Sequence, residues 1–139
     1  MGTTRSLLED QVCTWNDHDE ASWLDLFSPA ATFSAPGGLR GSGTEMATTF
    51  YRVWQDAFPD NQLKTLRIVD GEDAVVLEGV FEGTHTAALD GPGGPVPATG
   101  KRVAVPFVSL LGVSGDRFTS FAVYFDEMEF LIQLGLAGG

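Results

Sequence analysis

Three side chains in this 139-residue sequence have the types best suited to move protons in a pocket without a metal: His85, Glu78 and Asp126. An imidazole titrates near neutral pH, and burial in an apolar pocket raises the pKa of a carboxyl group towards the same range. Such a pair can catalyse a ring closure, because one group removes a proton between two carbonyls and the other protonates the new alkoxide. Tyr124 and Tyr51 supply phenol groups that can donate a hydrogen bond to the same substrate.

His85 and Asp126 also have structural explanations. His85 precedes the loop at residues 91–97, in which six of seven residues are Gly or Pro, so its ring can instead bond a backbone carbonyl and fix that loop. Asp126 opens the run FDEME, and acidic residues are favoured at the start of a helix. It can therefore cap that helix rather than act on a substrate.

Glu78 interrupts the apolar run VVLEGVF, where an unpaired buried carboxylate would be costly. It must face solvent, pair with a cation or line a cavity. Strict alternation places Glu78 and His85 on opposite faces of this strand, and only a bulge at Gly79 or Gly83 would bring them together.

Charge and composition exclude several classes of protein. A net charge of −11 at pH 7 opposes binding to nucleic acids or anionic membranes, whose phosphates attract basic surfaces. Cys13 is the single cysteine and the N-terminal run MGTTRSLLEDQ is too polar for a signal peptide, so we expect a cytoplasmic protein. The sequence has no P-loop, G-x-G-x-x-G or C-x-x-C pattern and no convincing set of metal ligands, so we expect no cofactor and no metal.

The pattern of apolar residues predicts one α+β domain over residues 1–139. Helices are expected at residues 3–16, between Asp19 and Pro29 with Trp23, Leu26 and Phe27, and from the capping-box pattern SGTE at 42–45 to Pro59. A short strand precedes the third helix, and four strands with short links and a terminal helix follow it. This order predicts a curved, mostly antiparallel sheet with helices packed on its concave face and a cavity between the two layers.

Several segments resemble the SnoaL-like polyketide cyclase family, within the cone-shaped folds of the nuclear-transport-factor-two-like superfamily. They are TWNDHDEASWLDLFSPAATF, FPDNQLKTLRIVDGEDAVVLEGVFEGTHTA, VPATGKRVAVPF and YFDEMEFLIQLGL, which cover most of the chain. The combination GTHT…PATGK-x-V and the closing FD…L-x-QLGL are the parts most specific to the family. The resemblance implies a cofactor-free enzyme, often a homodimer, that acts on a small hydrophobic, polyketide-like substrate inside the cone.

The resemblance also bears on the candidate site. Its GTHT motif includes His85, and the third helix usually covers the cone in this family. Substrate-binding residues are therefore expected among aromatic side chains, namely Tyr51, Trp54, Tyr124, Phe33 and Phe107. The reaction that it implies is an intramolecular aldol ring closure, and relatives perform isomerisation, hydration, epoxide opening or ether-ring closure.

One position departs from the family pattern. Aldol cyclases of this group carry an Asp directly after a Trp on the last strand, three residues before the Asp that starts the terminal helix. Alignment of that second Asp with Asp126 places Val123 and Ala122 at the two earlier positions. The expected acid or base of the aldol reaction is therefore absent from its usual place.

Two further readings stay open beside the cyclase. Val123 favours a non-catalytic ligand-binding or dimerisation module of the same fold. An isomerase, epoxide hydrolase or ether-ring-forming enzyme is the other alternative, and for epoxide opening the chain offers Arg52, Arg67 and Arg102. A cavity with two polar groups converging on it favours an enzyme, whereas a cone filled by Phe121 and Phe125 favours the module.

Overall fold

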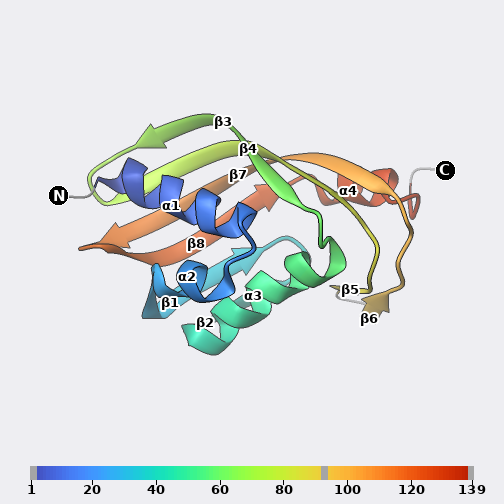
Figure 1. Ribbon diagram of the computed structural model, residues 1–139, viewed down its shortest axis with the longest axis horizontal. Coiled ribbons are helices and arrows are strands. Elements are labelled where there is room, and N and C mark those ends of the chain that lie inside the picture. The colour runs from blue at the N-terminus through green and yellow to red at the C-terminus, as the bar shows by residue number, and fades with distance from the viewer. Residues whose placement is uncertain (1–2, 92–93, 138–139) are drawn as a thin grey trace.

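The computed structural model describes residues 3–91 and 94–137 (Figure 1). Its elements follow one another as α1 (Thr4–Asn16), α2 (Glu20–Asp25), β1 (Phe27–Ala35), β2 (Leu39–Ser42), α3 (Gly43–Ala57), β3 (Gln62–Asp70), β4 (Ala74–Thr84), β5 (Leu89–Gly91), β6 (Gly94–Val96), β7 (Arg102–Ser114), β8 (Arg117–Phe125) and α4 (Glu127–Gln133). The α+β class predicted from the sequence is confirmed.

Six strands form one sheet in the order β2-β1-β8-β7-β4-β3 (Figure 1). All neighbours are antiparallel except β1 and β8, which run parallel and place Phe33 beside Phe121. β4 pairs with β7 without interruption along its whole length. The prediction of a mostly antiparallel sheet is therefore confirmed.

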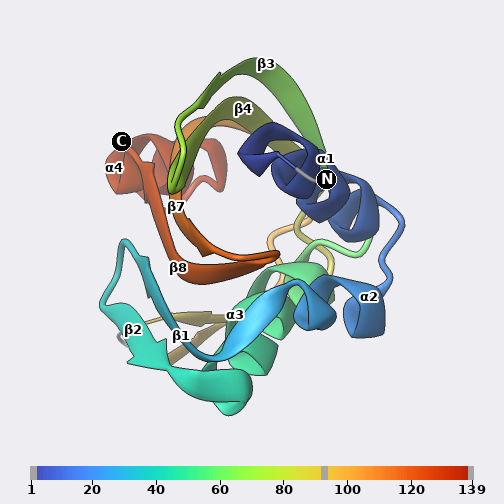
Figure 2. The same ribbon diagram turned by 90° about the vertical axis from the view of Figure 1, so that its left-hand side faces the viewer.

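The sheet is strongly curved, as the end-on view in Figure 2 shows, and α1, α2 and α3 lie on its inner side. α4 lies at a different place, beside β7 near the C-terminus. Gln133 holds it there, because its side chain donates to the carbonyl of Ala104 (2.9 Å) and accepts from the amide of Ala104 (2.7 Å).

The first two helices begin where the sequence predicts. The side chain of Asp19 accepts a hydrogen bond from the Ser22 amide (3.2 Å), which confirms Asp19 as the N-cap of α2. The predicted end of α2 was wrong, because the helix stops at Asp25 and Phe27 already belongs to β1. Pro29 lies inside β1, where the pairing with β8 is interrupted, so its missing N–H costs no ladder hydrogen bond.

The capping box predicted at residues 42–45 is only half present. Ser42 is the N-cap of α3, but its side chain makes no capping hydrogen bond. Ser42 is also the last residue of β2 and pairs with Thr32, and Gly43 follows with a positive φ of 93°. The chain therefore turns directly from strand to helix, and β2 is a strand that the sequence did not reveal.

The Gly- and Pro-rich segment is also more ordered than expected. Leu89 pairs with Val96 and Gly91 with Gly94, which makes β5 and β6 a small separate sheet. Residues 92–93 of the predicted loop lie outside the described residues.

β4 has no bulge at Gly79 or Gly83 that would bring Glu78 and His85 to the same face, and an irregularity lies in its pairing with β3 instead. The pairing of β3 with β4 shifts between Thr65 and Arg67, opposite Gly79 and Glu78. A Cβ at Gly79 would lie 2.6 Å from the carbonyl oxygen of Lys64 and 3.0 Å from the ring of Phe107, so only glycine fits there without a shift. Because β4 itself has no bulge, its side chains alternate regularly.

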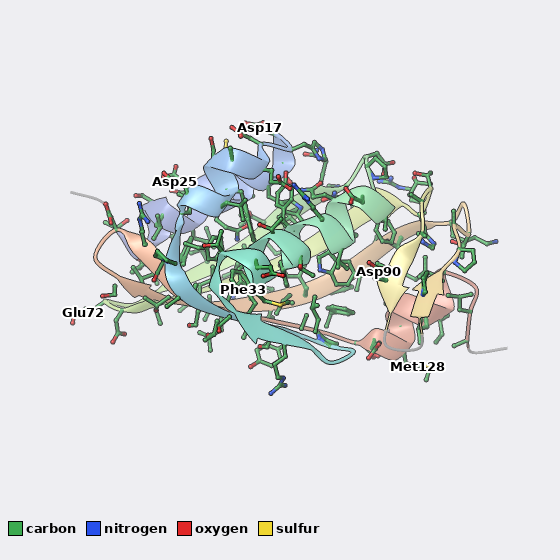
Figure 3. All side chains as sticks on the ribbon, turned by 90° about the horizontal axis from the view of Figure 1, so that it is seen from below. Asp17, Asp25, Phe33, Glu72, Asp90 and Met128 are labelled. Atoms are coloured by element: carbon green, nitrogen blue, oxygen red, sulfur yellow. The ribbon has the colours of Figure 1, made fainter. Side chains whose placement is uncertain are left out.

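The interior contains two adjacent apolar clusters. The larger is rich in aromatic rings, and the smaller lies towards α4 and includes Phe58, Val105 and Phe130. Figure 3 shows side chains from sheet and helices filling the space between the layers, with Glu72 at one end of the molecule and Asp90 in the half away from it. No helix in the described part of the chain is both long enough and apolar enough to cross a membrane.

Candidate functional site

A cavity opens where the two apolar clusters meet, as the sequence predicts. Its space is about 580 Å³ when the opening to solvent is included and about 60 Å³ when only positions for the centre of a water molecule are counted. The lining residues come from helices and strands of both layers: Gln11, Trp15, Phe50, Trp54, Leu63, Phe81, Val105, Phe107, Ser109, Phe121, Val123, Phe125 and Phe130. No ionisable side chain is among these described lining residues.

Trp15 is fixed in the cavity wall by a closed set of buried hydrogen bonds with Asn61 and Gln55. Its indole nitrogen donates to Asn61 (2.6 Å), whose amide donates to Gln55 Oε1 (2.7 Å). Gln55 in turn donates to the backbone carbonyl of Trp15 (3.1 Å). His18, which has a positive φ of 57°, lies 2.8 Å from the same Gln55 oxygen, so its Nδ1 is the donor. His18 thus has the structural role that a turn histidine suggests.

Ser109 is the polar residue of the sheet wall. It pairs with Leu77 on one side and Val123 on the other, and it is 1% exposed. Its side chain lines the cavity, and none of the side-chain hydrogen bonds found among the described residues involves its hydroxyl group. This hydroxyl therefore keeps its hydrogen-bonding capacity inside an apolar cavity.

Gln11 is the polar residue of the helical wall. It lies on α1 between Leu8 and Trp15, at helical spacing, and is 1% exposed. Its Oε1 accepts a hydrogen bond from the indole nitrogen of Trp23 (3.1 Å). Because an indole N–H only donates, this bond fixes which end of the amide is oxygen and leaves the NH₂ group as the free end.

Two of the five aromatic residues expected in the wall line the cavity, namely Trp54 and Phe107. Phe33 and Tyr51 are buried in the larger cluster instead, and Tyr51 packs against Trp15 with ring centroids 5.3 Å apart. Burial raises the pKa of Tyr51, so its phenol stays neutral. Tyr124 is 59% exposed, because its side chain points away from the inner face of β8.

His85 is fully buried but does not line the cavity. It stacks on Phe58, with ring centroids 5.2 Å apart, and its Nδ1 accepts from the amide of Thr99 (3.2 Å). The Thr99 hydroxyl lies 3.0 Å from the same nitrogen. Nε2 has no partner among the described residues. The ring thus links the segment before β7 to the end of β4, through a backbone amide rather than the backbone carbonyl expected from the sequence.

The environment of His85 predicts a pH-dependent stability. Burial lowers its pKa below the ordinary value of 6.5, and an interaction with the Ala87 backbone opposes this shift only in part. The unfolded chain therefore binds a proton at a pH where the folded chain does not. The contribution of His85 to the free energy of unfolding is fully present above pH 6.5, and it is lost as the pH falls below that value. We expect the urea midpoint of unfolding to decrease between about pH 8 and about pH 5.5.

A variant pair checks this expectation. His85→Asn keeps an acceptor for the Thr99 amide but cannot titrate, so its urea midpoint should change much less over the same range. His18→Asn removes the chain's other histidine and should keep the full decrease. An equal decrease in His85→Asn and the unmodified protein would assign the effect to other groups.

Glu78 and Asp126 lie on the outside of the molecule. Alternation along β4 turns Glu78 away from His85, as the sequence predicts, and Glu78 pairs with Arg67 at 3.4 Å. Asp126 is exposed and its side chain accepts from the Glu129 amide (3.1 Å), which confirms it as the N-cap of α4. The structure thus does not bring the three expected catalytic side chains together on one cavity.

The arginines considered for epoxide opening are also on the surface. Arg52 makes two hydrogen bonds to Glu20, at 2.7 and 2.9 Å, and Arg102 lies 3.9 Å from Glu82. Arg67 is the partner of Glu78. In residues 3–91 and 94–137, no group of three or more His, Cys, Asp or Glu side chains is placed to hold a metal ion.

The sequence pattern described as SnoaL-like polyketide cyclase matches residues 7–134. The chain belongs to this family. The resemblance that the motifs suggested is therefore confirmed, over nearly the whole sequence.

Solved structures show where this SnoaL-like chain stands among known folds. AclR, a candidate hydroxylase from Streptomyces galilaeus, is 25% identical, with a TM-score of 0.81 over 98% of this chain and 87% of that chain. IdmH, a candidate polyketide cyclase from Streptomyces antibioticus, is 23% identical, with a TM-score of 0.78 over 96% of this chain and 99% of that chain. A candidate polyketide cyclase from Xanthomonas campestris pv. campestris is 19% identical, with a TM-score of 0.83 over 94% of this chain and 96% of that chain. A comparison with curated proteins gives no match.

Val123 is the position at which this SnoaL-like protein departs most from the expected chemistry. Its side chain lines the cavity, and its neighbour across the β7–β8 pairing is Ser109. The place where an Asp was expected is thus part of the cavity wall, but it carries no ionisable group. The homodimer and the cytoplasmic location stay predictions.

Sequence reasoning missed Gln11 and Ser109, although both leave a signal. The inward positions of β7 read Val103, Val105, Phe107, Ser109 and Leu111, so a hydroxyl interrupts an apolar stripe. Gln11 interrupts the buried stripe of α1 in the same way. A polar residue within a buried stripe marks either a hydrogen-bonded core position or a cavity, and only the structure distinguishes the two.

Proposed function

We propose that this protein promotes ring closure or a related rearrangement of a small, largely apolar polyketide-like compound of secondary metabolism. The family supports this proposal, and so does the cavity. The observation that carries it is a cavity lined by aromatic rings with two neutral polar side chains, Gln11 and Ser109, and with no ionisable side chain among its described lining residues.

Such a cavity acts by enclosure and orientation. Aromatic walls bury the rings of a ligand at about 25 cal/mol per Å² of apolar surface, and exclusion of water strengthens each hydrogen bond inside. Holding a flexible chain with its reacting carbons in contact removes much of the entropic barrier to ring closure. Neutral donors then stabilise the negative charge that develops on a carbonyl oxygen during attack.

The proton balance of the aldol step does not require an ionisable residue when the substrate is an enolised 1,3-dicarbonyl. The enol carbon forms the new C–C bond with a ketone carbon, and the enol proton passes to the oxygen of that ketone. The chain's own residues have to orient the two carbons and stabilise the oxygen. Gln11 and Ser109 are two lining residues, one from each layer, whose polar groups can donate a hydrogen bond to it.

The probe 1-phenyloctane-1,3,5,7-tetraone tests this function. It closes through carbon 2 onto carbon 7, giving 2,4-dihydroxy-6-methylbenzophenone, or through carbon 6 onto carbon 1, giving 1-(2,4-dihydroxy-6-phenylphenyl)ethanone; both lose one water. We expect the protein to speed up one closure and change the product ratio measured by liquid chromatography. Leu63→Trp, which fills part of the cavity, should abolish the change. Leu66→Trp, on the exposed face of the same strand, should preserve it.

A non-catalytic ligand-binding module is the second candidate. The valine at position 123 and the lack of ionisable groups among the described lining residues favour it. In that case the tetraketone would bind, and binding would be weakened by Leu63→Trp, but the rate and ratio of its closure would match those in buffer.

A further inference from the structure

We propose that Gln11 and Ser109 determine ligand specificity, and that together they select an uncharged ligand with a carbonyl oxygen. The proposal rests on the cavity being the ligand site, as in the proposed function, but it concerns recognition rather than turnover. It assigns a role to the NH₂ group of Gln11, whose oxygen is bonded to Trp23, and to the hydroxyl group of Ser109.

Gln11 offers a donor whose direction is set by the protein. Trp23 is fully buried, and its indole N–H donates to Oε1 of Gln11 at 3.1 Å. The amide therefore cannot turn its oxygen into the cavity without breaking that bond. An amide NH₂ group with no acceptor in the described protein favours a ligand that brings an acceptor.

Ser109 offers a second donor from the opposite layer. Its neighbours across the sheet, Leu77 and Val123, are apolar, and the side chain of Ser109 is buried. A hydroxyl group can donate or accept, so it can adapt to the ligand, whereas Gln11 can only donate through its free end. Two donors that line one otherwise apolar cavity favour a ligand that carries an oxygen acceptor.

The electrostatics of the site exclude an anion. No Lys, Arg or His is among the described lining residues, so a carboxylate inside the cavity would lose its hydration without gaining a cation. The net charge of −11 adds a long-range repulsion. Among oxygen acceptors, a neutral ketone or aldehyde therefore fits best.

The aromatic walls determine the rest of the ligand. Trp54 lies edge-on to Phe81 and Phe125, with ring centroids 6.1 and 5.8 Å apart, and all three rings line the cavity. Such walls favour flat or conjugated rings, which bury area at little cost in conformational entropy. The ligand class is thus an uncharged aromatic or conjugated ketone.

Two bicyclic probes that differ in one carbonyl test this inference, namely 1-tetralone and tetralin. Equilibrium dialysis gives the dissociation constant of each. We expect the protein to bind 1-tetralone about 10-fold or more tighter than tetralin, because hydrogen bonds to a buried carbonyl add to the same apolar burial. Naphthalene-2-carboxylate should bind more weakly than either.

The variants separate recognition from packing. Ser109→Ala should weaken 1-tetralone several-fold and leave tetralin unchanged, and Ser109→Thr, which keeps a hydroxyl, should restore the preference. Gln11→Glu keeps an oxygen for Trp23 but replaces the donor, so 1-tetralone should bind poorly at high pH and recover as the carboxyl becomes protonated. Val105→Ala, a matched change in an apolar lining residue, should affect both probes alike.

Several results would overturn the inference. They are equal affinity of the unmodified protein for both probes, binding of neither probe, or an unchanged preference in both Ser109→Ala and Gln11→Glu. If the tetraketone closure is accelerated while any of these results is found, the proposed function stands and the two-donor recognition does not. If recognition holds and the closure is not accelerated, only the catalytic proposal fails.

Discussion

Trp23→Ala is expected to lower the free energy of unfolding by about 3–5 kcal/mol, the usual range for truncating a buried large aromatic side chain. Trp23 is 0% exposed. Its ring lies within 4.5–6.4 Å, between centroids, of six other aromatic rings, namely those of Trp15, Phe27, Phe33, Phe50, Tyr51 and Phe121. These rings come from both layers, so collapse around the missing side chain would require movement of sheet and helices.

Trp23→Phe is the matched control. It keeps a ring in the cluster but removes the donor to Gln11 Oε1, so we expect a smaller loss of about 1–3 kcal/mol. Urea unfolding followed by far-UV circular dichroism measures both variants without relying on tryptophan fluorescence. A loss below about 1 kcal/mol in Trp23→Ala would mean that Trp23 is not central to the packing of the two layers.

The strands were predictable where one face is buried and the other is exposed. β4 and β7 alternate over most of their length, which gave the opposite orientations of Glu78 and His85 and the regular pairing of the two strands. The boundary after α2 was not predictable, because the apolar spacing of Phe27 fits a helix as well as a strand. Phe27 belongs to a strand because it pairs in parallel with Phe118, which is distant in the sequence.

The site was predictable in part. Aromatic residues of α3 and β7 were expected in the wall, and Trp54 and Phe107 are there. His85, Glu78 and Asp126 were expected to be catalytic because their side chains can transfer protons. The type of a side chain does not determine whether it faces the cavity. The short turn before α4 makes Asp126 a cap, and the stacking of His85 on Phe58 buries its ring in the core beside the cavity.

Val123→Asp is expected to give the cavity the acid/base group that it lacks. The new carboxyl would project into the aromatic cavity beside the Ser109 hydroxyl, with no cation among the described lining residues, so burial would raise its pKa towards neutrality. A general base with such a pKa contributes roughly 10²–10⁴-fold to a proton transfer. We therefore expect closure of 1-phenyloctane-1,3,5,7-tetraone to become at least about 100-fold faster, with a rate that rises with pH through the pKa of the new group.

Val123→Asn separates the charge from the shape. It places a polar side chain of the same size beside Ser109 but cannot accept a proton, so its rate should stay that of the unmodified protein and show no new pH dependence. Both variants should lose about 1–3 kcal/mol of unfolding free energy, because a polar group replaces an apolar one in the wall. If folded Val123→Asp and Val123→Asn give equal rates, the reacting carbons of the substrate do not lie beside β8. The catalytic geometry would then have to be sought nearer to Gln11, at the helical wall of the cavity.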